Sequence, residues 1–345
     1  MRRISKNLWP VTIHKERGNM HVNVVHVLVG LVIFQVVLNV FYLASLARPS
    51  RECEDGIVKS ASAYNARRGK RTGNLEELEK SQELCLAYPH TLVGRITIDV
   101  NVTSTLEDIK HAMPAMTWGK WQPTDCKSSH RVAIIIPYRN RRHHLCLLLR
   151  YLHPFLQRQQ LHYRIFLAEQ AGVGTWNKGR VMNAGYLEAA KLFDFQCVIF
   201  HDVDLVPEDD RNSYGCHDTP LHMSSAPSQD KYKTLYKSLV GGVLKFPREH
   251  FLKVNGYSNE YWGWGGEDDD MALRLKASVF GFERVDLALG RYTSLTHENR
   301  DTNPRRMALL KNAKSKKNSD GVSAIPYHVE AVTDEKLYTH ILISI

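Results

Sequence analysis

The longest apolar stretch in this 345-residue sequence runs from about Val24 to Ala47 and contains no charged residue. About 20 such residues span the hydrocarbon core of a bilayer. Basic residues outnumber the single acidic Glu16 in the segment before it, which favours a cytosolic N-terminus. The stretch is too long and too far from the start for a cleaved signal peptide, which is the alternative interpretation. We therefore predict a cytosolic tail over 1–22, an uncleaved membrane anchor over 23–47 and a luminal remainder.

The next segment, residues 48–84, is rich in charged residues, Ser, Asn and Gly and poor in bulky apolar residues. Such a composition does not support a packed core and is typical of an extended stem. The sequence therefore predicts a stem that holds the following part of the chain away from the membrane.

From residue 85 onward, short apolar runs alternate with segments in which leucines and other apolar residues have helical spacing. This pattern predicts strands at 131–138, 163–169 and 197–201, with helices at 143–156 and 181–193. Alternating strands and helices imply an α/β domain with a doubly wound, mostly parallel sheet. Ligands bind beyond the carboxyl ends of the strands in such sheets, where Tyr138–Arg141 and Asp202–Asp204 fall.

Charge and cysteine usage narrow the interpretation further. The formal net charge is +10, but the basic residues are scattered and show no aromatic interleaving, so we expect no nucleic-acid partner. The absence of any CxxC pair argues against a structural zinc site, and a luminal domain permits disulfides. Asn101-Val102-Thr103 is an N-glycosylation sequon that a luminal position would make usable. The six cysteines are Cys53, Cys85, Cys126, Cys146, Cys197 and Cys216.

Asp202-Val203-Asp204 directly follows a predicted buried strand. In extended geometry its two carboxylates would point the same way, because side chains alternate with a period of two. Oxygens aimed at one point suit a hard cation such as Mn²⁺ or Mg²⁺, whose remaining positions would take diphosphate oxygens. The alternative is a solvated acidic turn.

The segment Tyr261–Asp270, YWGWGGEDDD, combines three glycines, two tryptophans and four successive carboxylates. Glycines allow a close approach of the backbone to a ligand, and tryptophan faces suit sugar rings. The carboxylates precede a predicted helix over Met271–Ala277, and acidic residues are favourable at such a position in any helix. That alternative does not explain the Gly/Trp array, whereas a general base beside an aromatic platform does.

Together these motifs resemble the β-1,4-galactosyltransferase family, glycosyltransferase family seven. The similarity runs from about Cys85 to the C-terminus, including Asp320-Gly321 and the closing stretch LYTHILI. It implies a GT-A fold over 85–345 and a single-pass type II enzyme of the Golgi membrane. The blocks that carry the resemblance are Pro137–Arg141 (PYRNR), Cys197–Leu205 (CVIFHDVDL), Leu239–Val243 (LVGGV) and Trp262–Asp270 (WGWGGEDDD).

The resemblance also implies roles for individual residues. Asp268 would be the catalytic base, with Glu267 orienting donor and acceptor. Asp204 and His297 would bind Mn²⁺, or Mg²⁺ or another divalent cation in its place. Residues expected to bind the UDP-sugar are Pro137, Tyr138, Arg139, Arg141, Trp176, Lys178, Asp202, Val203, Asp204, Gly242 and Trp264. Those expected to bind the acceptor are Tyr236, Gly266, Asp268, Asp269, Arg306, Met307 and Leu310.

The implied reaction is a single inverting displacement in which Asp268 takes a proton from the 4-hydroxyl of a terminal GlcNAc. A segment from about Gly290 to Lys314 would close over the donor. The family's disulfides map to Cys85–Cys126 and Cys197–Cys216, which leaves the roles of Cys53 and Cys146 open.

Three positions depart from the family pattern. Leu239 stands where galactose-transferring members typically carry Tyr, and its lack of a hydroxyl leaves room for an N-acetyl group, so we expect UDP-GalNAc as donor. Ser294 replaces a Met ligand of several members, which leaves the metal preference open. Met307 replaces a common aromatic residue and leaves the acceptor preference open.

Several alternatives remain at this point. UDP-Gal or UDP-GlcNAc could be the donor on the same scaffold, and the natural acceptor could be a glycoprotein or a glycolipid. A sugar-binding module without activity is a more distant alternative, which intact Asp268 and Asp204 disfavour. A homodimer is neither required nor excluded.

Overall fold

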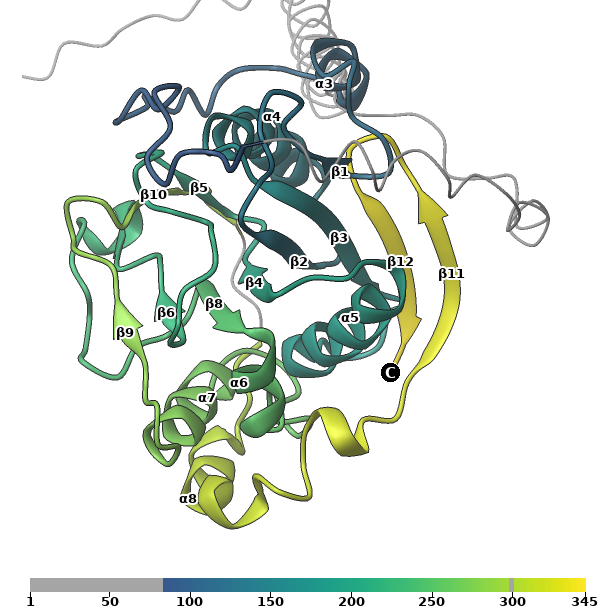
Figure 1. Cartoon of the computed structure of the whole chain (residues 1–345). Coiled ribbons are helices and arrows are strands. Elements are labelled where there is room, and N and C mark those ends of the chain that lie inside the picture. Colours follow the sequence, from purple (N-terminus) through teal and green to yellow (C-terminus); the bar gives the residue numbers. More distant parts are fainter. Residues whose placement is uncertain (1–82, 298–300) are drawn as a thin grey trace, which may run out of the picture. The chain divides into compact units, whose positions relative to one another are not determined.

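The computed structural model describes residues 83–297 and 301–345. Within them, the central sheet has nine strands and lies between helices on its two faces (Figure 1). β1 (Lys120–Trp121) pairs with β3 outside the main path. The main path runs in the order β11 (His328–Asp334), β12 (Thr339–Ser344), β3 (His162–Gln170), β2 (Arg131–Tyr138), β4 (Cys197–His201), β8 (Val243–Pro247), β6 (Leu221–His222) and β9 (Glu283–Arg284).

The centre of the sheet, from β12 through β3 and β2 to β4, is parallel throughout. The flanks are mixed, because β11, β1 and β8 each pair antiparallel with their neighbours, β6 runs antiparallel to β8, and β9 is parallel to β6. The predicted doubly wound, parallel arrangement therefore describes the centre, where the three strands predicted from apolar runs lie side by side. The antiparallel flanks were not predicted.

Helices cover both faces and carry much of the site. Two of them, α4 and α5, correspond to the helices predicted at 143–156 and 181–193, within a few residues at each end. The α-helices are α3 (Leu106–Ala112), α4 (Arg142–Arg158), α5 (Lys178–Leu192), α6 (Arg248–Lys253), α7 (Glu267–Lys276) and α8 (Arg306–Lys316), with 3₁₀ turns η1 (Ser228–Asp230) and η2 (Val322–Ala324).

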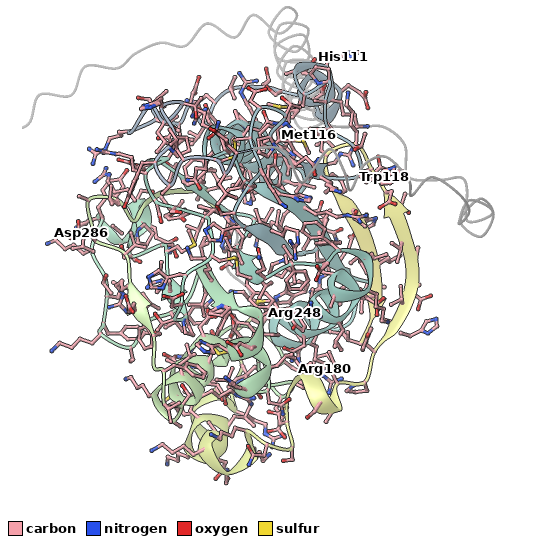
Figure 2. All side chains as sticks on the ribbon, in the orientation of Figure 1. His111, Met116, Trp118, Arg180, Arg248 and Asp286 are labelled. Atoms are coloured by element: carbon pink, nitrogen blue, oxygen red, sulfur yellow. A yellow bond between two sulfur atoms is a disulfide. The ribbon has the colours of Figure 1, made fainter. Side chains whose placement is uncertain are left out.

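Successive side chains of β2 point to opposite faces of the sheet and belong to two separate layers of the core. Val132, Ile134 and Ile136 belong to a cluster that includes the leucines of α4. Ala133 and Ile135 belong to a second cluster that includes the buried face of α5. All five side chains are fully buried, which is why the strand reads as a continuous apolar run. Figure 2 shows the side chains that fill the space between the sheet and these helices.

A second, three-stranded sheet of order β5-β10-β7 positions the metal-binding candidates. Its strands are β5 (Leu205–Pro207), β10 (Arg291–Ser294) and β7 (Ala226–Pro227). β5 follows Asp204 directly, and β10 ends three residues before His297. A backbone hydrogen bond from Leu295 N to Asp204 O, 2.8 Å long, extends this pairing toward the site. Two segments far apart in sequence are thereby joined beside Asp204.

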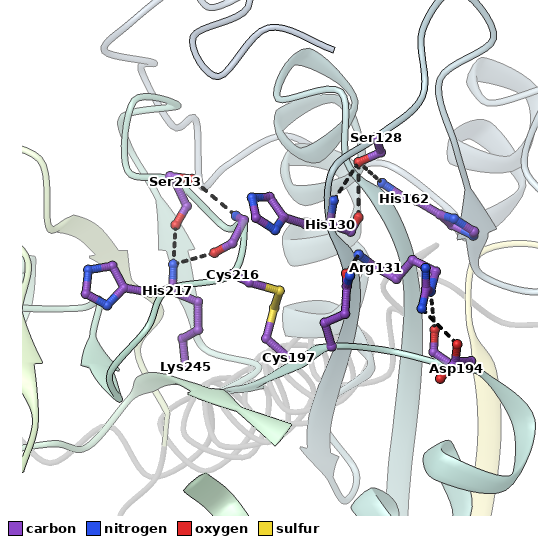
Figure 3. Close-up of a disulfide and its surroundings, with 12 residues drawn as sticks. Ser128, His130, Arg131, His162, Asp194, Cys197, Ser213, Cys216, His217 and Lys245 are labelled. Atoms are coloured by element: carbon purple, nitrogen blue, oxygen red, sulfur yellow. Dashed lines mark hydrogen bonds and ion pairs between the residues drawn. A yellow bond between two sulfur atoms is a disulfide. The ribbon is translucent and has the colours of Figure 1, made fainter. Parts of the chain in front are cut away.

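Both disulfides implied by the resemblance, Cys85–Cys126 and Cys197–Cys216, are confirmed. The second lies beside the buried Lys245, whose ammonium donates to the carbonyls of Ser213 and Gly215 (Figure 3). Burial lowers the pKa of Lys245 to about 7. Cys146 is also disulfide-bonded, and no cysteine of the described residues is free, while Cys53 lies outside them.

The predicted tail, anchor and nearly all of the predicted stem lie outside the described residues. Within residues 83–297 and 301–345, no helix is both long and apolar enough to span a membrane. The sequon residue Asn101 lies in an exposed turn.

Candidate active site

Two neighbouring pockets form at the carboxyl end of β4 and the N-terminal end of α7. Asp202, Asp204, Trp264, Glu267, Asp268 and His297 line both of them. The smaller pocket, which we call the donor pocket, is completed by Pro137, Arg141, Trp176, Lys178, Val203 and Gly263. The larger pocket, the acceptor pocket, adds the predicted residues Tyr236, Leu239, Gly242, Gly266, Asp269, Arg306, Met307 and Leu310.

The two carboxylates of the Asp202-Val203-Asp204 motif have different partners. The chain turns after β4, with Leu205 N hydrogen-bonded to Asp202 O at 3.4 Å, so the predicted extended geometry is wrong. Asp202 pairs with Lys178 at 2.9 Å, whereas Asp204 Oδ2 lies 3.1 Å from His297 Nε2. The turn therefore gives the two carboxylates different partners, although both line the two pockets.

Lys178, the first residue of α5, is the cation around which the site's carboxylates gather. Its ammonium lies 3.5 Å from Asp268 and 3.8 Å from Glu267, in addition to Asp202. Burial alone would lower the pKa of Lys178, but the attraction of Asp202, Asp268 and Glu267 raises it well above its ordinary value. The lysine therefore stays protonated and offsets part of the negative charge of the site.

The glycine-rich segment at 263–266, which we call the glycine array, precedes α7 and has backbone conformations that are unfavourable for other residues. Gly263, Gly265 and Gly266 have φ of +86°, +97° and +104°, values that other residues rarely adopt. A Cβ on Gly266 would lie 2.6 Å from the Tyr261 ring. The four carboxylates are the first turn of the helix itself, one turn earlier than the predicted start at Met271.

Burial raises the pKa values of Glu267 and Asp268, and neighbouring carboxylates add to the increase. Lys178 opposes the increase at both residues. A Cβ on Gly241 would lie 2.8 Å from Asp268 Oδ2, so the backbone of the LVGGV block closes against this carboxylate. Asp268 remains 24% exposed at its side chain, and a partly buried carboxyl group with a raised pKa and one cationic neighbour suits proton transfer.

The other two carboxylates of the cluster serve different purposes. Asp269 faces the acceptor pocket and accepts a 2.9 Å hydrogen bond from the Tyr236 hydroxyl. Asp270 is 2% exposed and is engaged by Arg274 and Tyr261, away from both pockets.

Asp204 and His297 fit a shared divalent cation. Two ligands on adjacent positions of an octahedral ion, each about 2.1 Å from it, lie about 3 Å apart, and the Asp204–His297 distance is 3.1 Å. The part of the chain that the structure describes contains no group of three or more His, Cys, Asp or Glu side chains arranged to hold a metal. The remaining positions would therefore fall to other oxygens, such as those of a diphosphate or water.

Ser294 does not lie in either pocket. Its hydroxyl is oriented toward η1 and accepts a 3.4 Å hydrogen bond from Gln229 N, while its own N–H bonds to Ser228. The serine at this position therefore supports the backbone beside His297.

The aromatic residues of the site differ in exposure. Trp176 is buried, whereas Trp264 is 55% exposed and the Arg306 guanidinium stacks 5.4 Å above its ring. Trp264 also exchanges backbone hydrogen bonds with Asp301 and Asn303. This contact joins the glycine array to the start of α8.

Two residues predicted to bind the donor, Tyr138 and Arg139, line neither of these two pockets. Gly242, also predicted to bind the donor, and Leu239, predicted to select the donor sugar, line only the larger pocket. Tyr138 is buried within β2, and Arg139 donates to Gly174 O and stacks 5.3 Å from the centre of the Trp176 ring. Both support pocket residues. The acceptor pocket also contains residues to which the sequence analysis gave no role. Three of them, Leu205, Gly241 and Gly265, belonged to blocks already singled out, and the others are Ser224, Pro227, Gln229, Asp230 and Leu235.

Two family models match the sequence over most of the described region. The N-terminal region of glycosyl transferase group 7 matches residues 85–217, and the N-terminal domain of galactosyltransferase matches residues 221–298. Together these matches contain every pocket residue up to His297.

Two similar curated proteins and two similar solved structures are also galactosyltransferases. A β-1,4-galactosyltransferase 4 from Cricetulus griseus is 41% identical over 75% of this chain and 76% of its own. The Homo sapiens β-1,4-galactosyltransferase 4 is 40% identical over the same shares. The catalytic domain of Drosophila β-1,4-galactosyltransferase 7 with xylobiose superposes with a TM-score of 0.56 at 26% identity, over 63% of this chain and 94% of that chain. A mutant of that enzyme with manganese, UDP-Gal and xylobiose gives a TM-score of 0.54 at 25% identity and the same coverage.

Proposed function

Because this chain belongs to glycosyltransferase family seven, the β-1,4-galactosyltransferase family, we propose that it transfers N-acetylgalactosamine from UDP-GalNAc to the 4-hydroxyl of a terminal GlcNAc. The enzyme class is established by the family: it is a UDP-sugar-dependent glycosyltransferase with a GT-A-like fold. The donor sugar, the acceptor and the individual residue roles are the proposal.

In the proposed reaction, Asp268 accepts the proton of the acceptor's 4-hydroxyl. The oxygen then attacks the anomeric carbon of the donor, and UDP leaves from the opposite face, so the anomeric configuration is inverted. Lys178, 3.5 Å from Asp268, supports the ionised carboxylate that a base requires. Glu267, buried beside it, orients donor and acceptor.

On the donor side, Asp204 and His297 would hold a divalent cation, with Mn²⁺ as the expected ion. When bound, the cation would offset the charge that develops on the departing diphosphate. Arg141 lies 3.9 Å from Asp204, and its buried Nη1 has no hydrogen-bond partner in the structure. A diphosphate oxygen would satisfy that donor.

Leu239 is the observation that carries the choice of donor. The side chain lines the acceptor pocket beside Gly241 and Gly242. Galactose-transferring relatives typically carry a tyrosine at this position, whose hydroxyl crowds the 2-position of the donor sugar. The aliphatic leucine has no such hydroxyl, and it would leave space and an apolar surface for an N-acetyl methyl group.

A second candidate is galactosyl transfer on the same scaffold. It is favoured by the names of the similar curated proteins, which are β-1,4-galactosyltransferases from rodents and human. The two candidates differ only in the donor sugar, so one comparison decides between them.

The deciding experiment supplies residues 85–345, expressed with disulfide formation, with a GlcNAc-terminated acceptor, Mn²⁺ and each of UDP-GalNAc, UDP-Gal and UDP-GlcNAc. We expect a β-1,4-linked product with the highest kcat/KM for UDP-GalNAc. Higher kcat/KM for UDP-Gal would establish the second candidate. Absence of transfer from all three donors would contradict both.

We expect Leu239→Tyr to lower the ratio of UDP-GalNAc to UDP-Gal kcat/KM by at least about tenfold, since such steric discrimination is typically worth 10–200-fold. The matched control is Leu252→Tyr, which makes the same change at an exposed position of α6 that lines neither pocket. It should leave the ratio within about twofold. An unchanged ratio in Leu239→Tyr would refute the steric account.

The predicted topology completes the proposal. A membrane anchor at 23–47 and a stem at 48–84 would place the catalytic domain in the Golgi lumen. The two disulfides between described cysteines support an oxidising compartment. Asn101, exposed in a turn, would be accessible to glycosylation there.

A further inference from the structure

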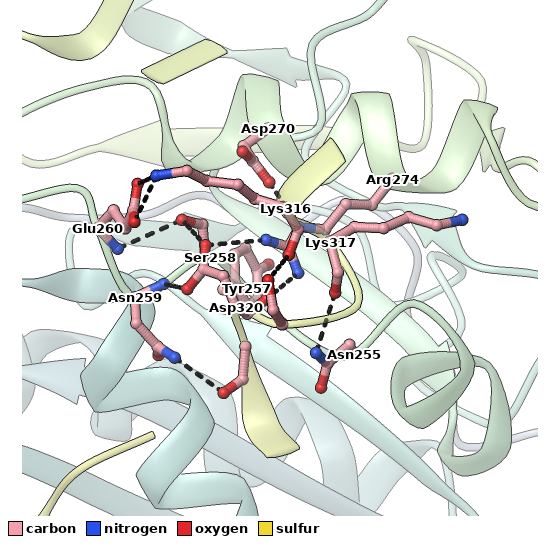
Figure 4. A network of polar contacts seen from close by, with 12 residues as sticks. Asn255, Tyr257, Ser258, Asn259, Glu260, Asp270, Arg274, Lys316, Lys317 and Asp320 are labelled. Atoms are coloured by element: carbon pink, nitrogen blue, oxygen red, sulfur yellow. Dashed lines mark hydrogen bonds and ion pairs between the residues drawn. The ribbon is translucent and has the colours of Figure 1, made fainter. Parts of the chain in front are cut away.

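A network of polar side chains surrounds the buried Arg274 of α7 (Figure 4). Its guanidinium is 1% exposed and contacts two carboxylates, Asp270 at 2.5 Å and Asp320 at 3.2 Å. The same group donates to the backbone carbonyls of Gly256 and Asp320. Neither Arg274 nor Asp320 lines the donor or the acceptor pocket, so the network needs a separate explanation.

Asp320 connects α7 with the loop that precedes the glycine array. One carboxylate oxygen accepts from Asn259 N at 2.8 Å, and the other from the Ser258 hydroxyl at 2.5 Å. Asp320 lies four positions after the last residue of α8, the helix whose first turns carry Arg306 and Met307 of the acceptor pocket. The Asp320 carboxylate thus connects three segments: α7, which carries Asp268, the loop at 258–259 before it, and the chain that follows α8.

The network continues to the start of α5. The Asn259 carbonyl accepts from the Asn177 side chain at 2.9 Å, and Asn177 is the residue that caps α5. The next residue, Lys178, contacts Asp268 at 3.5 Å. The contacts therefore form a closed ring. It runs from Asp270 through Arg274, Asp320, Asn259, Asn177 and Lys178 back to Asp268, and it begins and ends in the first turn of α7.

We infer that Asp320 and Arg274 are positioning residues for the transfer reaction, which set Asp268 against Lys178 and hold α8 over the acceptor. Neither residue touches a substrate. Arginine is suited to this role because its planar guanidinium bridges two carboxylates and the carbonyls at once. The inference rests on the proposed function, since it takes Asp268 as the base and α8 as the acceptor cover.

The ring reaches the donor pocket at Lys178 and Asp268 but does not include the metal-binding candidates Asp204 and His297. Arg141 pairs with Asp204, and Asp204 and His297 lie next to β5 and β10, whereas the ring residues lie on α5, on α7 and in the loops at 258–259 and 320. Removing one of the ion pairs or hydrogen bonds of the ring should therefore impair catalysis and acceptor binding while UDP binding persists. A purely stabilising network would behave differently: the folded fraction would keep its full kcat and acceptor KM.

The test is Asp320→Asn, which preserves shape and an acceptor for Asn259 N but removes the charge that faces Arg274. We expect kcat to fall about tenfold and the acceptor KM to rise several-fold, with the KM for the UDP-sugar within about twofold. Rates are divided by the concentration of sites that bind UDP with Mn²⁺, measured by calorimetry, so that unfolded protein does not enter the comparison.

Removing one partner of a buried ion pair can unfold a protein, because the other charge is left unpaired. Ser258→Ala is the second variant, since it deletes only the hydroxyl that donates to Asp320 and leaves every charge paired. A twofold to fivefold loss of kcat at unchanged donor KM is expected. Glu260→Gln is the matched control: it breaks a half-exposed ion pair with Lys316 in the same loop and should leave kcat within twofold.

Unchanged kcat and acceptor KM per UDP-binding site in both Asp320→Asn and Ser258→Ala would overturn the inference. Equal losses in Glu260→Gln would also overturn it, because the effect would then belong to the loop in general. If the unmodified chain transfers no sugar from any donor, the proposed function fails first. Active unmodified protein with fully active variants would refute the positioning role alone.

Discussion

Replacing Asp268 with Asn should lower the kcat for sugar transfer about 10³-fold, because general-base catalysis typically contributes 10²–10⁴-fold. The amide has nearly the same shape but cannot take the proton of the acceptor hydroxyl. UDP should still bind, since Arg141, Trp176 and Asp204 of the donor pocket are unchanged. The measurements are the transfer rate at saturating donor and acceptor and the affinity for UDP with Mn²⁺.

The control is Asp269→Asn, the same chemical change one residue further along α7. Asp269 faces the acceptor pocket and accepts a hydrogen bond from Tyr236. We expect its loss to raise the acceptor KM while kcat stays within about tenfold of the unmodified enzyme. Retained turnover in Asp268→Asn would remove this residue as the base.

The second large effect is expected at the cation site. Asp204→Asn should weaken Mn²⁺ binding and lower kcat/KM at least about 10²-fold, because even a residue that only supports a metal ligand is worth 10–100-fold. Excess chelator should abolish transfer by the unmodified enzyme, and added Mn²⁺ should restore it. Metal affinity is measured directly by calorimetry in the absence of donor, so the result does not depend on activity.

Asp202→Asn is the matched control for the cation site. Asp202 has the same chemistry two residues earlier but is paired with Lys178. We expect it to alter the transfer rate while the protein keeps its Mn²⁺ affinity within about threefold. Equal loss of metal affinity in both variants would mean that the whole motif binds the ion, contrary to the division of roles inferred from the turn.

The local sequence was sufficient to predict the central strands of the sheet. The strands β2 and β4 coincide with the apolar runs at 131–138 and 197–201, and β3 exceeds its predicted range by one residue at each end. These strands are buried on both faces, so most of their residues are apolar and the run is visible without tertiary information. The short strands β6 and β9 have two residues each and carry no such signal.

The identity of the site residues was also accessible from the motifs, whereas their pairing was not. Asp202 and Asp204 were expected to point the same way, yet the turn after β4 separates them onto Lys178 and His297. Likewise, the carboxylates at 267–270 form one run in the sequence, but only the helical turn places Asp270 against Arg274 and Asp268 in the pocket.

The sequence by itself therefore determined the family and the central strands and indicated the residues to which we assign the chemistry, because these depend on local apolar runs and short motifs. Only the tertiary structure decided which of those residues meet. Asp204 meets His297 because β5 pairs with β10, and Asp268 meets Lys178 because α7 and α5 both begin at the same edge of the sheet. Such contacts join residues about 90 positions apart in the chain, and no local pattern records where two distant segments come together.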